Sequence, residues 1–453
     1  MNIYISLEVA ARELDSKLLL AVLAASKGHE VVVSGFGEIL NALKTKTLKP
    51  GIVHTKSLTP SKKKIEKHQA VIDTGSKITS IDEESGIDEM SYDQFAKDRY
   101  SDLTIGQSSA VFGWGDEDVY TLKRIYPKNS NKIYKTGSPR VDLWQPFFFD
   151  YWKKPKGIIK KPFLLISSNQ ECTKMLTFHE EIKFNKTAGY FDRDQNLFKK
   201  IFYRMSEDYK KFYEFIEAIK HLSQNNNGYD IVLRPHPRDN MKNWEVVLED
   251  IPNVYIIRED SISAWVKNTF VVMHNGCTTA IEATISGKPV ITYNPFQMEY
   301  AKPIPNSLGY NINSKEELLK KVNELFISEK NRDKKDKIKI PEVLTKKLYI
   351  DTNELAAEKI IKIWESLDGK SLSKTNNWTK FYLLIKMMNI KKTVYKILNK
   401  LFSNNFGPLR ENYKFPPLDE NDINLRIIKL KNLLGIEKNI KCKIISERTI
   451  LIK

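Results

Sequence analysis

The chain has 453 residues, and its 41% hydrophobic and 28% charged residues are typical of a globular protein rather than a disordered one. Because one ordinary core does not reach this length, we expect two domains of roughly 150 to 180 residues and an extension. The net charge of +17, from 73 Lys and Arg against 56 Asp and Glu, favours a polyanionic partner, either nucleic acid or an anionic membrane surface.

Features that the sequence lacks exclude other classes of protein. No uncharged apolar stretch of about 18 residues is present, so we expect no membrane-spanning helix. Acidic residues precede any long apolar run at the N-terminus, so we predict no secretory signal. The cysteines Cys172, Cys277 and Cys442 lie far apart and match neither a metal motif nor a disulfide framework. We therefore expect a cytoplasmic protein without a bound metal.

The first half of the chain alternates short strands with helices. Leu14, Leu18 and Val22 recur at helical spacing and predict a helix over 10–27, which Gly28 ends. Further helices are predicted at 90–99 and 116–125. The predicted strands are 2–7, 30–36, 77–82, 102–107 and 132–137. This alternation of strands and helices is typical of a parallel, doubly wound sheet.

The same alternation begins again at 162–168 and continues through a long predicted helix at 197–223. Shorter strands and helices then follow one another up to residue 295. We therefore predict an α/β protein with two Rossmann-like domains facing each other across a cleft, which is the GT-B architecture. The predicted boundaries are 1–145 for the N-terminal acceptor-side domain, 146–335 for the C-terminal nucleotide-sugar-binding domain, and 336–453 for a helical, basic extension.

The segment 378–402 in this extension carries six lysines and no acidic residue. It predicts a basic amphipathic helix that contacts an anionic bilayer surface. The alternative is a helix packed on the C-terminal domain with its lysines in solvent. The apolar side chains that define the predicted face are Phe381, Leu384, Ile385, Met388, Val394, Ile397, Leu398 and Leu401.

The stretch IVLRPHPRDN, residues 231–240, places a stiff polar loop directly after a predicted buried strand. Ligands of parallel α/β sheets bind beyond the carboxyl ends of strands. Two prolines flank His236 and restrict the backbone around it. The imidazole of His236 can then bond or protonate a phosphate, and Arg234 can add charge-assisted hydrogen bonds. The alternative is a strand-end turn with a surface histidine.

The stretch HNGCTTAIEATISGKP, residues 274–289, places hydroxyl groups after another predicted strand. Asn275 ends the strand, Gly276 permits a close backbone approach, and Thr278 and Thr279 begin a helix whose free N–H groups favour an anion. Glu282, one turn further on, is placed to accept hydrogen bonds from the hydroxyls of a ribose. The alternative is an ordinary capped helix with Glu282 as the capping-box partner.

These two motifs in this order resemble the C-terminal half of GT-B glycosyltransferases that use cytidine-nucleotide donors. Bacterial sialyltransferases, Kdo transferases and CDP-glycerol polymerases share the HP motif and a Ser/Thr pair. The segments 11–35, 78–86 and 136–144 resemble, in the same order, the bacterial surface carbohydrate biosynthesis proteins. That family has DEEG and GNPR motifs where this chain has DEESG, with Ser85 inserted, and GSPR. The resemblance covers residues 1–330.

The resemblance implies that His236, Thr278 and Thr279 hold the donor phosphate. It also implies that one acid of the DEESG motif serves the acceptor side, either as a base or as a nucleophile. The candidates are Asp82, Glu83 and Glu84, with a solvated loop end as the alternative. Three more residues are candidates for binding the donor or acceptor. Arg12 and Glu13 begin the first helix, and Arg140 either contacts the ligand or holds the hinge.

The function that these features predict is a glycosyltransferase at the inner face of the cytoplasmic membrane. It would move a sugar, an acidic one from a CMP-activated donor, onto a surface glycan or lipid-linked acceptor. We expect no cofactor besides the nucleotide sugar. The alternatives are a nucleotide-sugar 2-epimerase of the same fold and a non-catalytic nucleotide-binding assembly partner. A nucleic-acid-binding protein is disfavoured because the lysines are scattered and no nucleic-acid motif is present.

Overall fold

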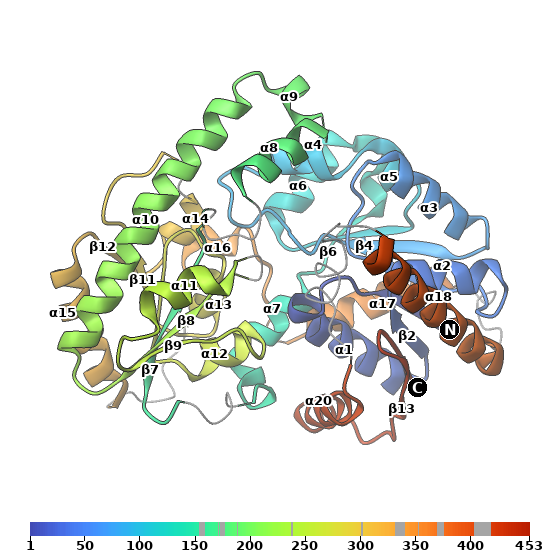
Figure 1. The fold of residues 1–453 in the computed structure, drawn as a ribbon. Coiled ribbons are helices and arrows are strands. Elements are labelled where there is room, and N and C mark those ends of the chain that lie inside the picture. Colours follow the sequence, from blue (N-terminus) through green and yellow to red (C-terminus); the bar gives the residue numbers. More distant parts are fainter. Residues whose placement is uncertain are drawn as a thin grey trace. The chain divides into compact units, whose positions relative to one another are not determined.

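The computed structural model describes all residues except 154–158, 171, 173–176, 188, 237–238, 300–301, 331–339, 352, 369–375 and 403–417. The chain forms two compact units. Unit 1 consists of 1–87, 91–151 and 342–453, and unit 2 consists of 88–90 and 152–341. Each unit has a mainly parallel sheet with helices (Figure 1), so the predicted α/β class with two Rossmann-like domains is confirmed.

Unit 1 is built on an eight-stranded sheet in the order β13-β14-β2-β1-β3-β4-β5-β6. Strands β1 to β6 are parallel, whereas β14 pairs antiparallel with β2 and β13 pairs antiparallel with β14. The strands are β1 (Asn2–Ser6), β2 (Glu30–Ser34), β3 (Ile52–Thr55), β4 (Lys77–Ile81), β5 (Ala110–Gly113), β6 (Ile133–Lys135), β13 (Cys442–Ser446) and β14 (Thr449–Ile452).

The helices of unit 1 fall into groups that contact one another. Helices α1, α7, α17 and α20 form one group, because α1 contacts the other three, and α18 contacts α2, which contacts α3. The helices are α1 (Ala10–Ser26), α2 (Phe36–Lys44), α3 (Lys62–Ile72), α4 (Asp93–Arg99), α5 (Asp102–Gly106), α6 (Asp116–Ile125), α7 (Pro139–Trp144), α16 (Glu342–Thr345), α17 (Ala356–Asp368), α18 (Trp378–Phe402) and α20 (Glu420–Leu433). The short 3-10 helices η1 (Pro127–Lys132) and η2 (Pro146–Tyr151) complete it.

The strand predicted at 102–107 is wrong, because this segment forms helix α5. The hydroxyl of Ser101 accepts a hydrogen bond from the backbone N–H of Thr104, and the Thr104 hydroxyl accepts one from the N–H of Ser101. This reciprocal capping box satisfies two N–H groups that a helix start otherwise leaves unpaired. The capping box therefore favours a helix, although apolar residues alternate with polar ones in this segment, the pattern that had predicted a strand.

The C-terminal residues complete unit 1 and do not form only a helical extension. Strands β13 and β14 extend the sheet beyond β2. Helix α18 packs Phe381 and Ile385, both fully buried, into the core on α2 and β1 to β4. Burial of each such side chain stabilises unit 1 by about 1.5–3 kcal/mol. Part of the apolar face predicted to meet a membrane therefore packs against unit 1. The side chains of 395–402 lie outside the described residues.

Unit 2 is built on a six-stranded parallel sheet in the order β12-β11-β10-β7-β8-β9. Its strands are β7 (Phe163–Ser167), β8 (Asp230–Arg234), β9 (Val254–Ile256), β10 (Val271–His274), β11 (Val290–Tyr293) and β12 (Tyr310–Ile312). Its helices are α8 (Phe178–Thr187), α9 (Tyr190–Arg193), α10 (Leu197–Asn225), α11 (Met241–Leu248), α12 (Ile262–Asn268), α13 (Thr279–Ile285), α14 (Pro303–Asn306) and α15 (Lys315–Lys330). Helix α10 confirms the long helix predicted at 197–223.

One hydrophobic core holds unit 2 together. Leu164, Ile231, Val271 and Ile291 place it on the central strands, and Phe215 adds the buried face of α10. Central strands of a parallel sheet are buried on both faces, which is why they consist of nearly continuous apolar residues.

Among the described residues, no helix is long and apolar enough to cross a membrane.

Candidate functional site

Polar side chains of unit 2 gather where β7, β8 and β10 end. These three strands are parallel neighbours, and β7 lies between the other two. Their carboxyl ends therefore meet at one edge of the sheet, which is where ligands of such folds bind. The segments that follow the strands begin at Ser168, Pro235 and Asn275. They contain both of the motifs that the sequence had indicated.

Asp239 holds the loop that carries His236. Its buried carboxylate accepts hydrogen bonds from the Ser168 hydroxyl at 2.8 Å, the backbone N–H of His236 at 3.0 Å and the indole N–H of Trp244 at 3.2 Å. The Ser168 hydroxyl also accepts from the His236 N–H at 3.0 Å. The end of β7 and the loop after β8 are therefore joined into one hydrogen-bonded frame.

A second set of hydrogen bonds joins the end of β7 to the segment after β10. The side-chain amide of Asn169 donates to the carbonyl of Gly276 at 2.9 Å, and the Ser167 hydroxyl donates to the hydroxyl of Thr279 at 3.1 Å. Gly276 has a φ of +74°, a left-handed conformation that favours glycine. Sequence reasoning identified Gly276 and Thr279 but not Ser167, Ser168 or Asp239, whose role depends on the pairing of distant strands.

His236 and Thr278 are more exposed than Ser168 and Asp239, which hold the loop in place. His236 is half-buried, and Thr278 is exposed with no hydrogen-bond partner for its hydroxyl among the described residues. Helix α13 spans only seven residues, so its dipole adds less than the sequence motif suggested. Binding of an anion at this edge therefore depends mainly on side chains and loop N–H groups.

Two other predicted residues, Arg234 and Asn275, are engaged within the protein. The guanidinium of Arg234 donates to the carbonyls of Glu259 and Asp260 and lies over the ring of Trp265, and burial lowers its pKa to about 10. The Asn275 amide donates to the carbonyl of Tyr293 at 2.7 Å. These contacts position the loops, so the structure does not direct the predicted donors of Arg234 and Asn275 at a phosphate.

Glu282 is also buried, with 4% of its surface exposed. Its charge acts on Lys267, which is fully buried. Burial lowers the pKa of Lys267 to about 8, and the charge of Glu282 opposes that shift. The sequence analysis offered a capping box between Thr278 and Glu282 as the alternative. The Thr278 side chain makes no such capping hydrogen bond among the described contacts.

His274, the last residue of β10, is a structural residue that the sequence analysis did not single out. It is fully buried, and burial lowers its pKa to about 3, so its imidazole is neutral at physiological pH. Its Nε2 pairs with the Thr292 hydroxyl at 3.0 Å, and its Nδ1 accepts from the N–H of Cys277 at 3.4 Å. His274 thus fixes the turn that leads into Thr278.

Unit 1 has its own polar cluster at the carboxyl end of β4, formed around the predicted acidic motif. Glu83 is 3% exposed and forms an ion pair with Lys17 of α1, which is 1% exposed. Burial alone would raise the pKa of Glu83, but the charges of Lys17 and Arg140 outweigh it and hold the pKa below its ordinary value. The Glu83 Oε2 atom has no hydrogen-bond partner among the described residues. Glu83 is therefore a carboxylate that is ionised at physiological pH and has one oxygen unpaired.

The two other acids of the motif differ from Glu83. Asp82 is 1% exposed and accepts two hydrogen bonds from the Arg99 guanidinium, at 2.9 and 3.0 Å, which occupy both carboxylate oxygens. Glu84 is 46% exposed and pairs with Arg99 at 3.2 Å. The inserted Ser85 is buried and adopts a φ of +54°, a conformation that costs energy in a residue with a side chain. Asp82 is thus a structural anchor, and Glu83 is the carboxylate with free capacity.

The predicted basic residues of unit 1 support this motif. The Arg140 guanidinium donates to the carbonyl of Glu83 at 2.8 Å and lies over the rings of Trp114 and Trp144. Arg12 lies 3.1 Å from the Glu13 carboxylate and 3.8 Å from that of Glu84.

Glu13 is fully buried and serves the start of α1. Its Oε2 accepts from the backbone N–H groups of Glu8 and Val9 at 3.1 and 3.3 Å. This is the geometry of a helix-terminal acid, which satisfies N–H groups at the turn between β1 and α1.

Among the described residues, no group of three or more His, Cys, Asp and Glu could hold a metal ion.

Comparisons with solved structures identify the fold. A candidate UDP-N-acetylglucosamine 2-epimerase from Listeria monocytogenes is 13% identical with a TM-score of 0.50, over 82% of this chain and 97% of that one. A UDP-GlcNAc 2-epimerase from Methanocaldococcus jannaschii is 16% identical with a TM-score of 0.46, over 81% and 100%. The catalytic domain of starch synthase IV from Arabidopsis thaliana, solved with ADP and acarbose, is 13% identical with a TM-score of 0.36, over 82% and 99%.

The likeness to the Listeria protein shows a shared fold of two Rossmann-like domains. No family model and no curated protein matches the chain. The resemblance of its motifs to the surface carbohydrate biosynthesis proteins therefore stays a prediction, as do the roles that it implied for individual residues.

Removal of the Lys17 ammonium tests the ion pair at the centre of unit 1. The variant Lys17→Met should lose about 3–5 kcal/mol of unfolding free energy, because it leaves the Glu83 carboxylate buried without its cation. The double variant Lys17→Met/Glu83→Leu should recover most of this loss, since no buried charge remains. Chemical denaturation followed by tryptophan fluorescence measures both. Equal losses in the single and double variants would show that the pair is not buried as described.

Proposed function

We propose that unit 2 binds the phosphates of a nucleotide sugar at the carboxyl ends of β7, β8 and β10. The observation that carries this proposal is the frame of hydrogen bonds from Ser168, Asp239 and Asn169. It holds His236 and Thr278 at one edge of a parallel sheet, where ligands of this architecture bind. A histidine and a hydroxyl are suitable donors to phosphate oxygens.

The reaction that the fold comparison supports best is 2-epimerisation of a UDP-activated N-acetylhexosamine. The Listeria neighbour is described as an enzyme of this kind, and it shares the fold over almost its whole length. This likeness favours uridine over the cytidine nucleotide expected from the sequence motifs. Inversion at C2 requires that the proton on C2 leaves and that a proton returns to the opposite face of the same carbon.

Glu83 is our candidate for a catalytic carboxylate carried by unit 1. Its lowered pKa makes it a weak proton acceptor that carries a negative charge at physiological pH. Such a charge stabilises positive charge that develops at the anomeric carbon when a sugar–phosphate bond weakens. Its buried position, with one oxygen already paired with Lys17, limits reorganisation of that charge during the reaction.

Incubation of the full chain with UDP-GlcNAc in D₂O, without any acceptor, tests the reaction. The C2 epimer should form with deuterium at C2, which proton nuclear magnetic resonance detects directly. The variant Glu83→Gln should lower turnover by about 100-fold or more, because an electrostatic contribution of this size is typical of a positioned catalytic group. Its matched control, Glu84→Gln, changes a half-exposed carboxylate of the same motif and should lose much less.

Absence of deuterium at C2 would contradict the epimerase. Release of UDP or CMP that depends on an added glycan acceptor would instead support the second candidate, the glycosyltransferase predicted from the sequence. One observation favours this candidate. Helix α18 presents exposed apolar side chains that a soluble small-molecule epimerase does not need, but that an enzyme acting on lipid-linked acceptors does.

We propose that α18 makes peripheral contact with an anionic membrane surface. Leu383, Met387, Ile390 and Val394 recur every three or four residues, and their exposed fractions are between 49% and 58%. They lie on a different side of the helix from Phe381 and Ile385, which pack into unit 1. Exposed lysines of the same helix supply charge complementary to acidic headgroups, at Lys380, Lys386 and Lys391.

Co-sedimentation with phospholipid vesicles tests this contact. The protein should bind vesicles that contain phosphatidylserine and should dissociate at high salt, because part of the attraction is electrostatic. The triple variant Leu383→Ser/Met387→Ser/Ile390→Ser should lose most of this binding without unfolding. Replacement of three other exposed apolar residues, at Tyr120, Val246 and Ile327, serves as the control. Equal losses in both triple variants would argue against a specific role of α18.

A further inference from the structure

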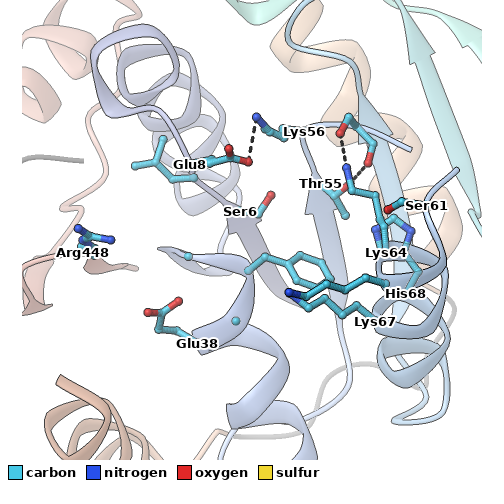
Figure 2. A pocket seen from close by; sticks show the side chains of 16 residues that line it. Ser6, Glu8, Glu38, Thr55, Lys56, Ser61, Lys64, Lys67, His68 and Arg448 are labelled. Carbon is cyan, nitrogen blue, oxygen red and sulfur yellow. Dashed lines mark hydrogen bonds and ion pairs between the residues drawn. The ribbon is translucent and has the colours of Figure 1, made fainter. Parts of the chain in front are cut away.

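Unit 1 contains a cavity of about 550 Å³ that none of the motifs predicted. It lies at the carboxyl ends of β1, β2 and β3, next to the starts of α2 and α3 (Figure 2). The turn between β13 and β14 contributes Arg448, so the C-terminal hairpin forms part of its wall. The lining side chains with charged or ring groups are Glu8, Phe36, Glu38, Lys56, Lys63, Lys64, Lys67, His68 and Arg448.

The charge of this cavity is strongly positive. Five of the lining residues are Lys or Arg and two are Glu. Lys56 is neutralised by Glu8, at 2.9 Å. Lys64 and Lys67 have no carboxylate partner among the described residues, and the Lys64 ammonium donates to the Ser57 hydroxyl at 2.5 Å. Burial, together with the charges of Arg99 and Lys56, lowers the pKa of Lys64. A half-buried ammonium without a carboxylate partner is a site of unsatisfied positive charge.

His68 supplies an independent observation. Its side chain is 2% exposed, lies against the ring of Phe36 and lines the cavity, yet its Nδ1 has no hydrogen-bond partner among the described residues. Burial lowers its pKa to about 4, so the imidazole is neutral at physiological pH. Buried polar atoms of native proteins nearly always have a partner, so an unpaired one in the wall of a cavity indicates a missing ligand group.

We propose that this cavity binds a phosphorylated sugar, with its phosphate held by Lys64, Lys67 and His68. These three side chains come from α3 and lie on one side of the cavity, whereas Glu8 and Glu38 lie on the other (Figure 2). Carboxylates are acceptors for sugar hydroxyls, and ammonium groups bind phosphate oxygens. The volume falls in the range of roughly 300–1,000 Å³ typical of small-molecule sites, and it exceeds the needs of a bare phosphate ion.

This site is separate from the nucleotide site proposed in unit 2, and it does not depend on that proposal. All of its lining residues belong to unit 1. None is among the residues predicted from the sequence motifs. It is nevertheless close to the acidic motif, because the backbone N–H of Glu83 donates to the carbonyl of Lys56 at 3.1 Å. The cavity and the acidic motif are therefore joined through the backbone of Lys56.

Isothermal titration of the full chain with N-acetylglucosamine 1-phosphate, in the presence of saturating UDP, tests the site. UDP occupies the unit 2 site if that proposal holds, and a parallel titration without UDP shows whether its phosphates compete for the cavity. The sugar phosphate should bind, and unphosphorylated N-acetylglucosamine should not. The variant Lys67→Ala should weaken binding at least tenfold, since a hydrogen bond to a charged group contributes about 1.5–3 kcal/mol.

Lys62→Ala is the matched control, because it removes the same charge from the same helix without touching the cavity. Its affinity should stay within about twofold of the unchanged chain, given the screening of exposed charges by salt. A lipid headgroup can carry the same phosphate, and vesicles that contain phosphatidic acid test whether the cavity binds it. Loss of vesicle binding in Lys67→Ala would show that the bound phosphate belongs to a lipid. No binding of either phosphorylated probe, or equal losses in Lys62→Ala and Lys67→Ala, would overturn the proposal.

Discussion

Parallel pairing of strands is the constraint on which every candidate site of this protein depends. In a parallel sheet, neighbouring strands end at the same edge, so the segments that follow them must turn there side by side. Their backbone N–H groups lack sheet partners at that point, and polar side chains take over the pairing. In unit 2 this brings Ser168, Asp239 and Gly276 together from three distant parts of the chain. In unit 1 the same edge carries the Glu83 motif and the cavity above β1, β2 and β3.

Within this edge, residues that hold the structure can be separated from residues that remain available to a ligand. Asp82 and Arg234 have their polar atoms occupied by the protein, whereas the Oε2 atom of Glu83 and the Nδ1 atom of His68 are buried without a partner among the described residues. Leaving a buried polar atom unpaired costs free energy, and that cost is recovered when a ligand supplies the missing partner. The unpaired Nδ1 atom of His68 therefore supports a ligand in the cavity of unit 1, and the exposed hydroxyl of Thr278 is available to donate to a phosphate in unit 2.

Local signals in the sequence predicted much of the fold, and they failed where distant pairing decides. Helical periodicity found α1, α6 and α10, and apolar runs followed by polar loops found β7, β8 and β10 with His236 and Thr278. The segment 102–107 was predicted as a strand because its capping box was not recognised. Strands β3, β5 and β12 were missed, and so were β13 and β14 in the segment predicted as a helical extension. The cavity could not be predicted, because a lysine-rich helix such as α3 has the sequence of a solvated surface. Only the fold shows that Lys64, Lys67 and His68 line one cavity.

The measurement that tests the central claim most directly is calorimetric titration of the full chain with UDP, CDP and CMP, repeated with Thr278→Val. A matched control is Thr284→Val, which removes the same hydroxyl from helix α13 at a position whose hydroxyl only bonds the helix backbone. The account predicts binding of at least one of these nucleotides, with UDP preferred, and about a tenfold or greater loss in Thr278→Val but not in the control, because one hydrogen bond to a charged phosphate is removed. Absence of binding to all three, or equal affinities in the two variants, would contradict a nucleotide site at the ends of β7, β8 and β10.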